Sequence, residues 1–202
     1  MEYLVLGFFT GLSLILALGA QNIFVIEQGL KKQHIFLVCF ICSISDLILI
    51  FLGIFLFHYF IQYFNSTIEL IFNILLIIFL IHFIYLKIKS FKLKVNFNDK
   101  APNISKFNIF LKTLGFTYLN PHVYSDTVFF LGNFSKNFIL NQKILFGVGA
   151  SIASFVFFFI IGYLSKFLSQ YAQNETVWKI INIFIISFMS LLTIFVILET
   201  IN

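Results

Sequence analysis

The sequence predicts an all-α membrane protein with six transmembrane helices, arranged as two inverted three-helix repeats. Hydrophobic residues make up 60% of the 202 residues, charged residues make up only 10%, and the mean hydropathy is +1.02. A soluble chain of this length cannot bury so much apolar surface. The apolar residues also gather in six long runs, and the two halves of the chain resemble each other.

Each apolar run is long enough to supply the about 20 residues that cross about 30 Å of hydrocarbon. The first run lacks the basic region of a secretory signal, since it follows Met1-Glu2-Tyr3, and we expect it to be a retained helix. The six expected spans are 3–26, 36–60, 68–88, 109–132, 143–166 and 177–199.

The lysines predict the orientation in the cytoplasmic membrane. All 13 basic residues are Lys, and 11 of them follow the first, third and fifth spans: Lys31, Lys32, Lys87, Lys89, Lys92, Lys94, Lys100, Lys106, Lys112, Lys166 and Lys179. Only Lys136 and Lys143 lie on the other side. The positive-inside rule therefore predicts that both termini lie outside, provided that no span is re-entrant.

The chain is expected to consist of a first repeat (1–88), a basic cytoplasmic linker (89–108) and a second repeat (109–202). The ten residues from Asn65 and the ten from Asn174 are identical at five positions, and the same offset of 109 pairs Gly53 with Gly162. We interpret the lysines of the linker as determinants of topology rather than as a nucleic-acid patch. A repeat of three spans must be inverted in its second copy, an architecture typical of transporters.

Asp46 is the acidic residue predicted to lie nearest the bilayer centre. It follows the start of the second span by about ten residues, or about 15 Å of helix. A charge at that depth is costly, so the side chain should face a cavity or a partner and is a candidate binding residue. The alternative is a protonated Asp46 that only packs against a neighbouring helix.

The fourth span contains an unusual polar segment around Pro121. Proline removes a backbone donor, which predicts a broken or kinked helix with a freed carbonyl group. Asn120 precedes it, and His122 and Asp126 follow four residues apart. We interpret Asn120, His122 and Asp126 as candidate solute-binding residues, with a structural histidine as the alternative for His122.

The first span contains a second candidate break at Gly19, followed by Gln21 and Asn22. Backbone groups at a helix break, with two amides beside them, suit the carboxylate and ammonium of a zwitterion. The alternative for Asn22 is helix capping. The position of these residues in the run places them nearer the cytoplasmic end than Pro121.

Cys39 and Cys42 form a Cys-x-x-Cys motif, which in other settings carries thiol–disulfide chemistry. Here no charged or proline neighbour would lower a thiol pKa, so two buried small residues are the favoured interpretation. The sequence contains no metal-ligand cluster and no nucleotide loop, so we expect no metal, no cofactor and no enzymatic activity.

Three motifs resemble those of the LysE family of amino-acid exporters, in particular its lysine/arginine exporter branch. They are Leu-Gly-Ala-Gln-Asn-Ile-Phe-Val at 18–25 followed by Gln28-Gly29, Ser-Asp-Leu at 45–47, and Leu-Asn-Pro-His-Val-Tyr-Ser-Asp-Thr at 119–127. The resemblance covers essentially the whole chain. The sequence differs from the family pattern at Ala20, where the family usually has proline. The expected break in the first span therefore depends on Gly19.

The resemblance implies secondary export of L-lysine and/or L-arginine across the cytoplasmic membrane by alternating access. Asp46 and Asp126 would bind the cationic groups or carry a coupling ion, expected to be a proton, and Gln21, Asn22 and Asn120 would hold the substrate's carboxylate or ammonium. Export of a neutral amino acid or a metal cation is an alternative function. A function of a different class, thiol-disulfide redox chemistry using Cys39 and Cys42, is a further alternative. The partners are then the substrate, the coupling ion and the lipid bilayer, with a homo-oligomer left open.

Overall fold

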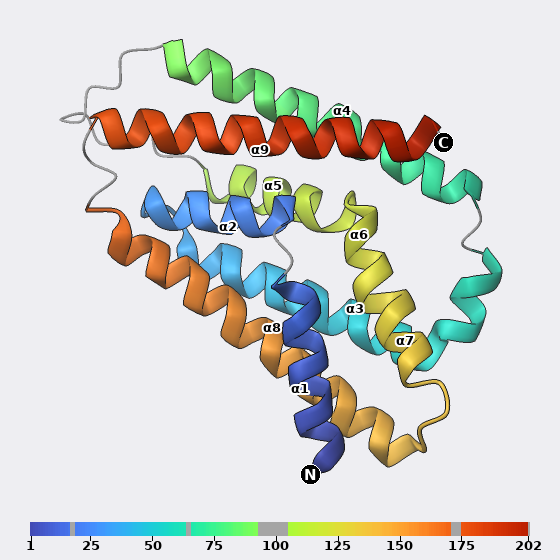
Figure 1. Ribbon diagram of the computed structural model, residues 1–202. Helices are drawn as coiled ribbons and strands as arrows, with labels where there is room; N and C mark the ends of the chain where they lie inside the picture. The colour runs from blue at the N-terminus through green and yellow to red at the C-terminus, as the bar shows by residue number, and fades with distance from the viewer. Residues whose placement is uncertain (17–18, 64–65, 93–104, 171–174, 202) are drawn as a thin grey trace.

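The computed structural model describes residues 1–201 apart from 17–18, 64–65, 93–104 and 171–174. The described residues form helices and no strand (Figure 1). In chain order these are α1 (Glu2–Ile15), α2 (Ala20–Leu30), α3 (Ile35–Tyr63), α4 (Ser66–Lys92), α5 (Lys106–Tyr118), α6 (Pro121–Tyr124), the π-helical turn η1 (Ser125–Phe130), α7 (Leu131–Phe134), α8 (Leu140–Leu168) and α9 (Glu175–Ile201).

Three continuous helical stretches are long and apolar enough to cross a membrane: Ile35–Phe57, Leu140–Leu168 and Lys179–Leu198. They coincide with the second, fifth and sixth predicted spans. In α4 the apolar stretch Asn73–Leu86 is shorter, and the first predicted span corresponds to the bent pair α1 and α2. The protein is therefore a multi-pass membrane protein, while the count of six spans stays a prediction. The predicted linker lies largely outside the described residues, between α4 and α5.

The first span is broken sharply between α1 and α2, whose axes differ by 82°. Gly19 precedes α2 in an extended conformation (φ −110°, ψ 178°). The sequence predicted this break from Gly19 alone, without the proline expected at position 20. Its sharpness shows that proline is not needed at this position.

The fourth predicted span is divided into α5, α6, η1 and α7, with a break between α5 and α6 rather than a kink in one helix. Because Pro121 has no N–H, it cannot continue α5, but it suits the first turn of a new helix. α5 accordingly ends at Tyr118 and α6 begins at Pro121. The chain then widens into the π-helical turn η1 before α7.

Helix packing crosses between the two halves of the chain. α1 and α2 both pack on α8, α3 packs on α8, α5, η1 and α7, and α4 lies beside α9 (Figure 1). The contact of α1 with α8 is very close, since a Cβ added to Gly7 would lie 2.0 Å from the carbonyl oxygen of Phe146. Small residues allow such approaches between membrane helices.

Phe116 of α5 joins three helices in the core near the helix breaks. Its ring stacks on Phe24 of α2 at a centroid distance of 4.6 Å. The rings of Phe79 and Phe83 of α4 meet it edge-on at 4.7 and 5.0 Å. These aromatic contacts hold α2, α4 and α5 together and thereby position the polar residues at the start of α2.

Gly149→Ala should destabilise the protein by about 1–3 kcal/mol, the usual cost of overpacking. The new Cβ would lie 2.0 Å from the carbonyl oxygen of Leu4, so α1 and α8 would have to separate. Thermal unfolding in detergent measures the effect. Ile152→Val on the same helix is the control, because Ile152 is 42% exposed. Equal unfolding midpoints for Gly149→Ala and the parent would contradict the close packing.

Candidate functional site

The site centres on Asp46, which is only 3% exposed in α3. The hydroxyl of Ser154 in α8 donates a hydrogen bond of 2.7 Å to its Oδ2. Ser43, one turn earlier on α3, instead donates to the carbonyl oxygen of Cys39 in its own helix. The partner of the buried acid therefore comes from the second half of the chain, and the sequence did not identify it.

Gln21 of α2 lies beside the Asp46 carboxylate and the Cys42 thiol. Its side chain is 6% exposed, and its Nε2 makes no hydrogen bond of standard geometry among the described residues, although the amide is close enough to both groups to interact with them. Asp126 lies within electrostatic range of Asp46 as well. Two of the predicted residues from the first half, Gln21 and Asp46, thus gather with Asp126 from the second.

The two helix breaks face each other. A Cβ added to Gly19 would have the amide nitrogen of Asn120 as its nearest neighbour, at 4.0 Å. Asn120 is 5% exposed, and its Oδ1 accepts a hydrogen bond from the backbone N–H of His122 at 3.2 Å. The bend in the first predicted span brings α2 against α5, and Gly19 thus lies beside the residue that precedes Pro121. The depth of Gln21 and Asn22 relative to Pro121 in the membrane stays a prediction.

Asn22 supplies a hydrogen-bond donor to a backbone carbonyl group at the first break. Its Nδ2 donates a hydrogen bond of 2.9 Å to the carbonyl oxygen of Ile15, the last residue of α1. The side chain is 5% exposed. This amide therefore has the structural role that the sequence left as an alternative, although it caps the end of α1 rather than the start of α2.

At the second break, the corresponding donor is a residue that the sequence did not identify. The hydroxyl of Tyr124 donates to the carbonyl oxygen of Tyr118, the last residue of α5, at 2.9 Å. His122 and Asp126 are half-buried and lie within electrostatic range of each other. The π-helical turn that carries Asp126 is a form often found at functional sites.

Glu27 is a second buried acid that sequence reasoning missed. It is 2% exposed in α2 and forms an ion pair with Lys31, one turn later. Lys112 of α5 lies within electrostatic range of both. Lys31 and Lys112 were interpreted only as topology determinants, but the i, i+4 spacing of Glu27 and Lys31 was a readable signal for the pair.

The thiols of Cys39 and Cys42 are free and fully buried. Cys39 donates a hydrogen bond to the carbonyl oxygen of Phe158 in α8, at 3.2 Å. A Cβ added to Gly162 would lie 2.5 Å from the Cys39 sulfur, so the Cys39 side chain fills the space between α3 and α8 at Gly162. Within the described ranges, no group of three His, Cys, Asp or Glu side chains is placed to hold a metal ion.

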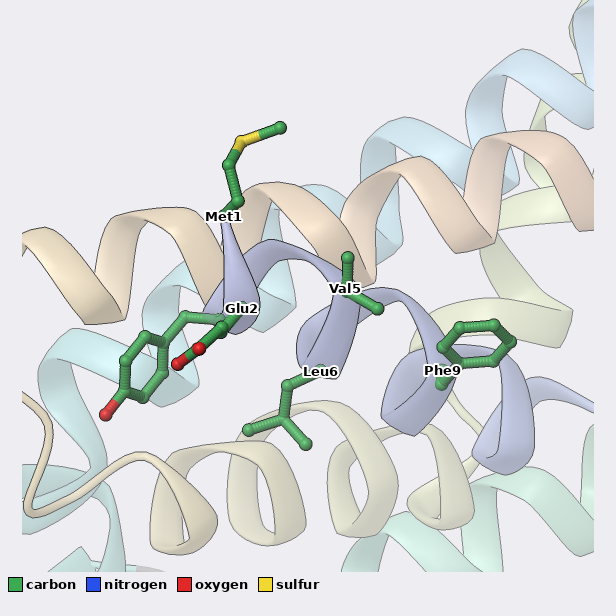
Figure 2. A pocket seen from close by; sticks show the side chains of 6 residues that line it. Met1, Glu2, Val5, Leu6 and Phe9 are labelled. Atoms are coloured by element: carbon green, nitrogen blue, oxygen red, sulfur yellow. The ribbon is translucent and has the colours of Figure 1, made fainter.

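The surface of α1 has a hollow lined by six residues at the start of the chain (Figure 2). None of the predicted site residues lines it. Met1 is 88% exposed and Phe9 is 63% exposed. Outward apolar side chains suit a helix in contact with lipid, so this hollow is no candidate for the solute site.

Two interrupted helices that meet beside a buried carboxylate, in a multi-pass membrane protein, are typical of solute transporters. The comparisons with known proteins agree. The chain belongs to the LysE family, since the family model for the LysE type translocator matches residues 12–200.

Curated relatives cover nearly the whole chain. An arginine exporter protein, ArgO, of Pectobacterium carotovorum is 32% identical over 185 residues, 89% of this chain and 88% of the relative. The arginine exporter ArgO of Salmonella typhimurium is 29% identical over 189 residues, 91% of this chain and 88% of the relative. No solved structure matches the chain.

Ser154→Ala should destabilise the protein by about 1–3 kcal/mol, because it leaves the buried Asp46 without the hydrogen bond that Ser154 donates. In a double-mutant cycle, the loss should largely disappear in an Asp46→Ala background, where the acceptor is gone. Unfolding in detergent measures both. Ser151→Ala is the matched control, since Ser151 donates to Gly147 within α8. Additive effects of the two substitutions would refute the contact.

Proposed function

We propose that this protein exports L-arginine and/or L-lysine across the cytoplasmic membrane as a secondary transporter working by alternating access. Membership of a family of translocators supports this proposal, as do the relatives named arginine exporters. The observation that carries it is Asp46, a carboxylate 3% exposed between apolar helices at the point where the two helix breaks meet.

The residues at the breaks match the chemistry of a basic amino acid. The guanidinium or ammonium of the substrate's side chain would pair with Asp46, and Asp126 would bind the second cationic group or carry the coupling ion. The N–H groups at the start of α2 and the Nε2 of Gln21 would face the substrate's carboxylate, since helix N-termini favour anions. Asn120 and His122 would complete the site from the other break.

Reciprocal packing of the two halves supports inverted repeats and alternating access. The broken first span packs on α8, and the broken fourth span packs on α3. At the first contact, a Cβ on Gly29 would lie 2.5 Å from the carbonyl oxygen of Gly162. At the second, a Cβ on Gly132 would lie 2.7 Å from the carbonyl oxygen of Gly53. Gly53 and Gly162, paired by sequence, thus make equivalent contacts with the other half.

The third helices of the two halves also pair. α4 lies beside α9, and Asn73 and Asn182, which the sequence offset relates, are 4% and 8% exposed. Asn65 and Asn174 lie outside the described residues. A rocking motion of the broken helices against α3 and α8 would open the site to one side at a time, with a proton as the proposed coupling ion and both termini outside.

Asp46→Asn should reduce export by about tenfold or more, because hydrogen bonds to a charged group are worth about 1.5–3 kcal/mol. Cells preloaded with labelled arginine or lysine, and expressing equal amounts of parent or variant, report the efflux rate directly. Glu2→Gln is the matched control, since Glu2 is an exposed acid on α1. Efflux by Asp46→Asn at the parent rate would remove Asp46 from the substrate site.

The same assay separates the related substrates. A panel of arginine, lysine and neutral amino acids, together with growth tests at toxic metal concentrations, should show efflux of the basic amino acids alone. Export of a neutral amino acid, with arginine and lysine efflux no higher than in cells that lack the protein, would contradict the assignment of substrate while leaving transport intact.

Replacing both Cys39 and Cys42 with Ala should leave arginine efflux within about twofold of the parent. The Cys39 thiol packs between α3 and α8, and its hydrogen bond to the Phe158 carbonyl oxygen is lost, at a typical net cost of about 1 kcal/mol of stability. The Cys42 thiol lies beside Gln21 of α2 and Thr117 of α5. Efflux normalised to the amount of protein in the membrane is the measurement. Complete loss of efflux in a well-expressed double variant would favour thiol-redox chemistry instead.

A further inference from the structure

We propose that the pocket between α4 and α5 binds the headgroup of an anionic phospholipid. This pocket is separate from the candidate solute site around Asp46, and the proposal does not depend on which solute is transported. The pocket has a volume of about 250 Å³.

The pocket combines an apolar wall with a cationic rim. Phe79, Phe83 and Leu86 of α4 and Leu111 of α5 form the wall. The polar lining consists of His82, Asn108 and Lys112. Donors beside apolar and aromatic side chains suit a phosphate ester that continues into acyl chains.

The charges near the pocket leave a positive excess. Lys112 is half-buried and lies within electrostatic range of Lys31 and Glu27. Glu27 already forms an ion pair with Lys31. Two lysines therefore share one carboxylate, and the ammonium of Lys112 stays available to a phosphate. Basic pockets between membrane helices on the cytoplasmic side are known to hold anionic headgroups.

The surfaces beside the pocket are apolar and face outward. On α4, Ile78 and Tyr85 are each 61% exposed and flank His82 at helical spacing. On α5, Phe107 is 65% exposed, one turn before Leu111. These faces would lie along acyl chains. The predicted orientation also places the end of α4 and the start of α5 at the cytoplasmic surface, where anionic lipids are found.

A tryptophan reporter at the pocket tests the proposal. Leu111→Trp, in a Trp178→Phe background so that only the reporter fluoresces, is reconstituted in vesicles of phosphatidylcholine with increasing brominated phosphatidylglycerol or brominated phosphatidylcholine. Leu111 is 49% exposed, so the larger ring should be tolerated. A reporter at Ile160, which is 57% exposed on α8, is the matched control for ordinary lipid contact.

We expect brominated phosphatidylglycerol to quench the reporter at position 111 with an affinity about fivefold above that of phosphatidylcholine, the factor that corresponds to one lysine at an anionic surface. Lys112→Gln should abolish the preference, and Lys136→Gln should keep it. The reporter at position 160 should show no preference. Equal quenching by the two lipids at position 111 would overturn the proposal, as would a preference that survives Lys112→Gln. Quenching at position 111 that is weaker with both lipids than at position 160 would also overturn it, because lipid would then be excluded from the pocket.

Discussion

The hydrogen bond between Asp46 and Ser154 sets the constraint on which the centre of the protein depends. A carboxyl group only 3% exposed in an apolar helix needs a polar partner, because nothing in hydrocarbon replaces its hydration. Ser154 supplies that partner from α8 at 2.7 Å, so α3 and α8 must pack in one register. Gln21 lies beside the same carboxyl group, which places the start of α2 there as well.

The helix breaks obey the same rule, since each frees backbone groups that a bilayer cannot satisfy. Asn22 donates to the carbonyl oxygen of Ile15 at the first break, and Tyr124 donates to that of Tyr118 at the second. Both donors belong to the segment that follows the break. An alternating-access motion that changed the angle at either break would have to exchange these bonds for others. If the proposed motion occurs in this way, the Asn22 amide and the Tyr124 phenol are positions at which that motion and the stability of the protein would be coupled.

Local chemistry could be predicted from the sequence, whereas partners far apart in the chain could not. Gly19 and Pro121 identified both breaks, because the effects of glycine and proline act within one turn. Ser154 lies 108 residues from Asp46 and looks like any serine in an apolar helix, so its role requires the packing of α3 on α8. The 82° bend likewise depends on where α2 packs, and the approach of Gly19 to Asn120 could not be derived from sequence position alone.

Gln21 connects the stability of the site with its proposed selectivity. Its Nε2 lies beside the Asp46 carboxylate but makes no hydrogen bond of standard geometry there or elsewhere among the described residues. An unsatisfied buried donor costs about 1–3 kcal/mol, and a ligand that brought a better-placed acceptor to Gln21 would recover part of such a cost on binding. A substrate with both a cationic end for Asp46 and a carboxylate for Gln21 would recover more than a simple cation or a simple acid. If the proposed site is correct, the pair would favour a zwitterion with an additional positive charge, which is the chemistry of a basic amino acid.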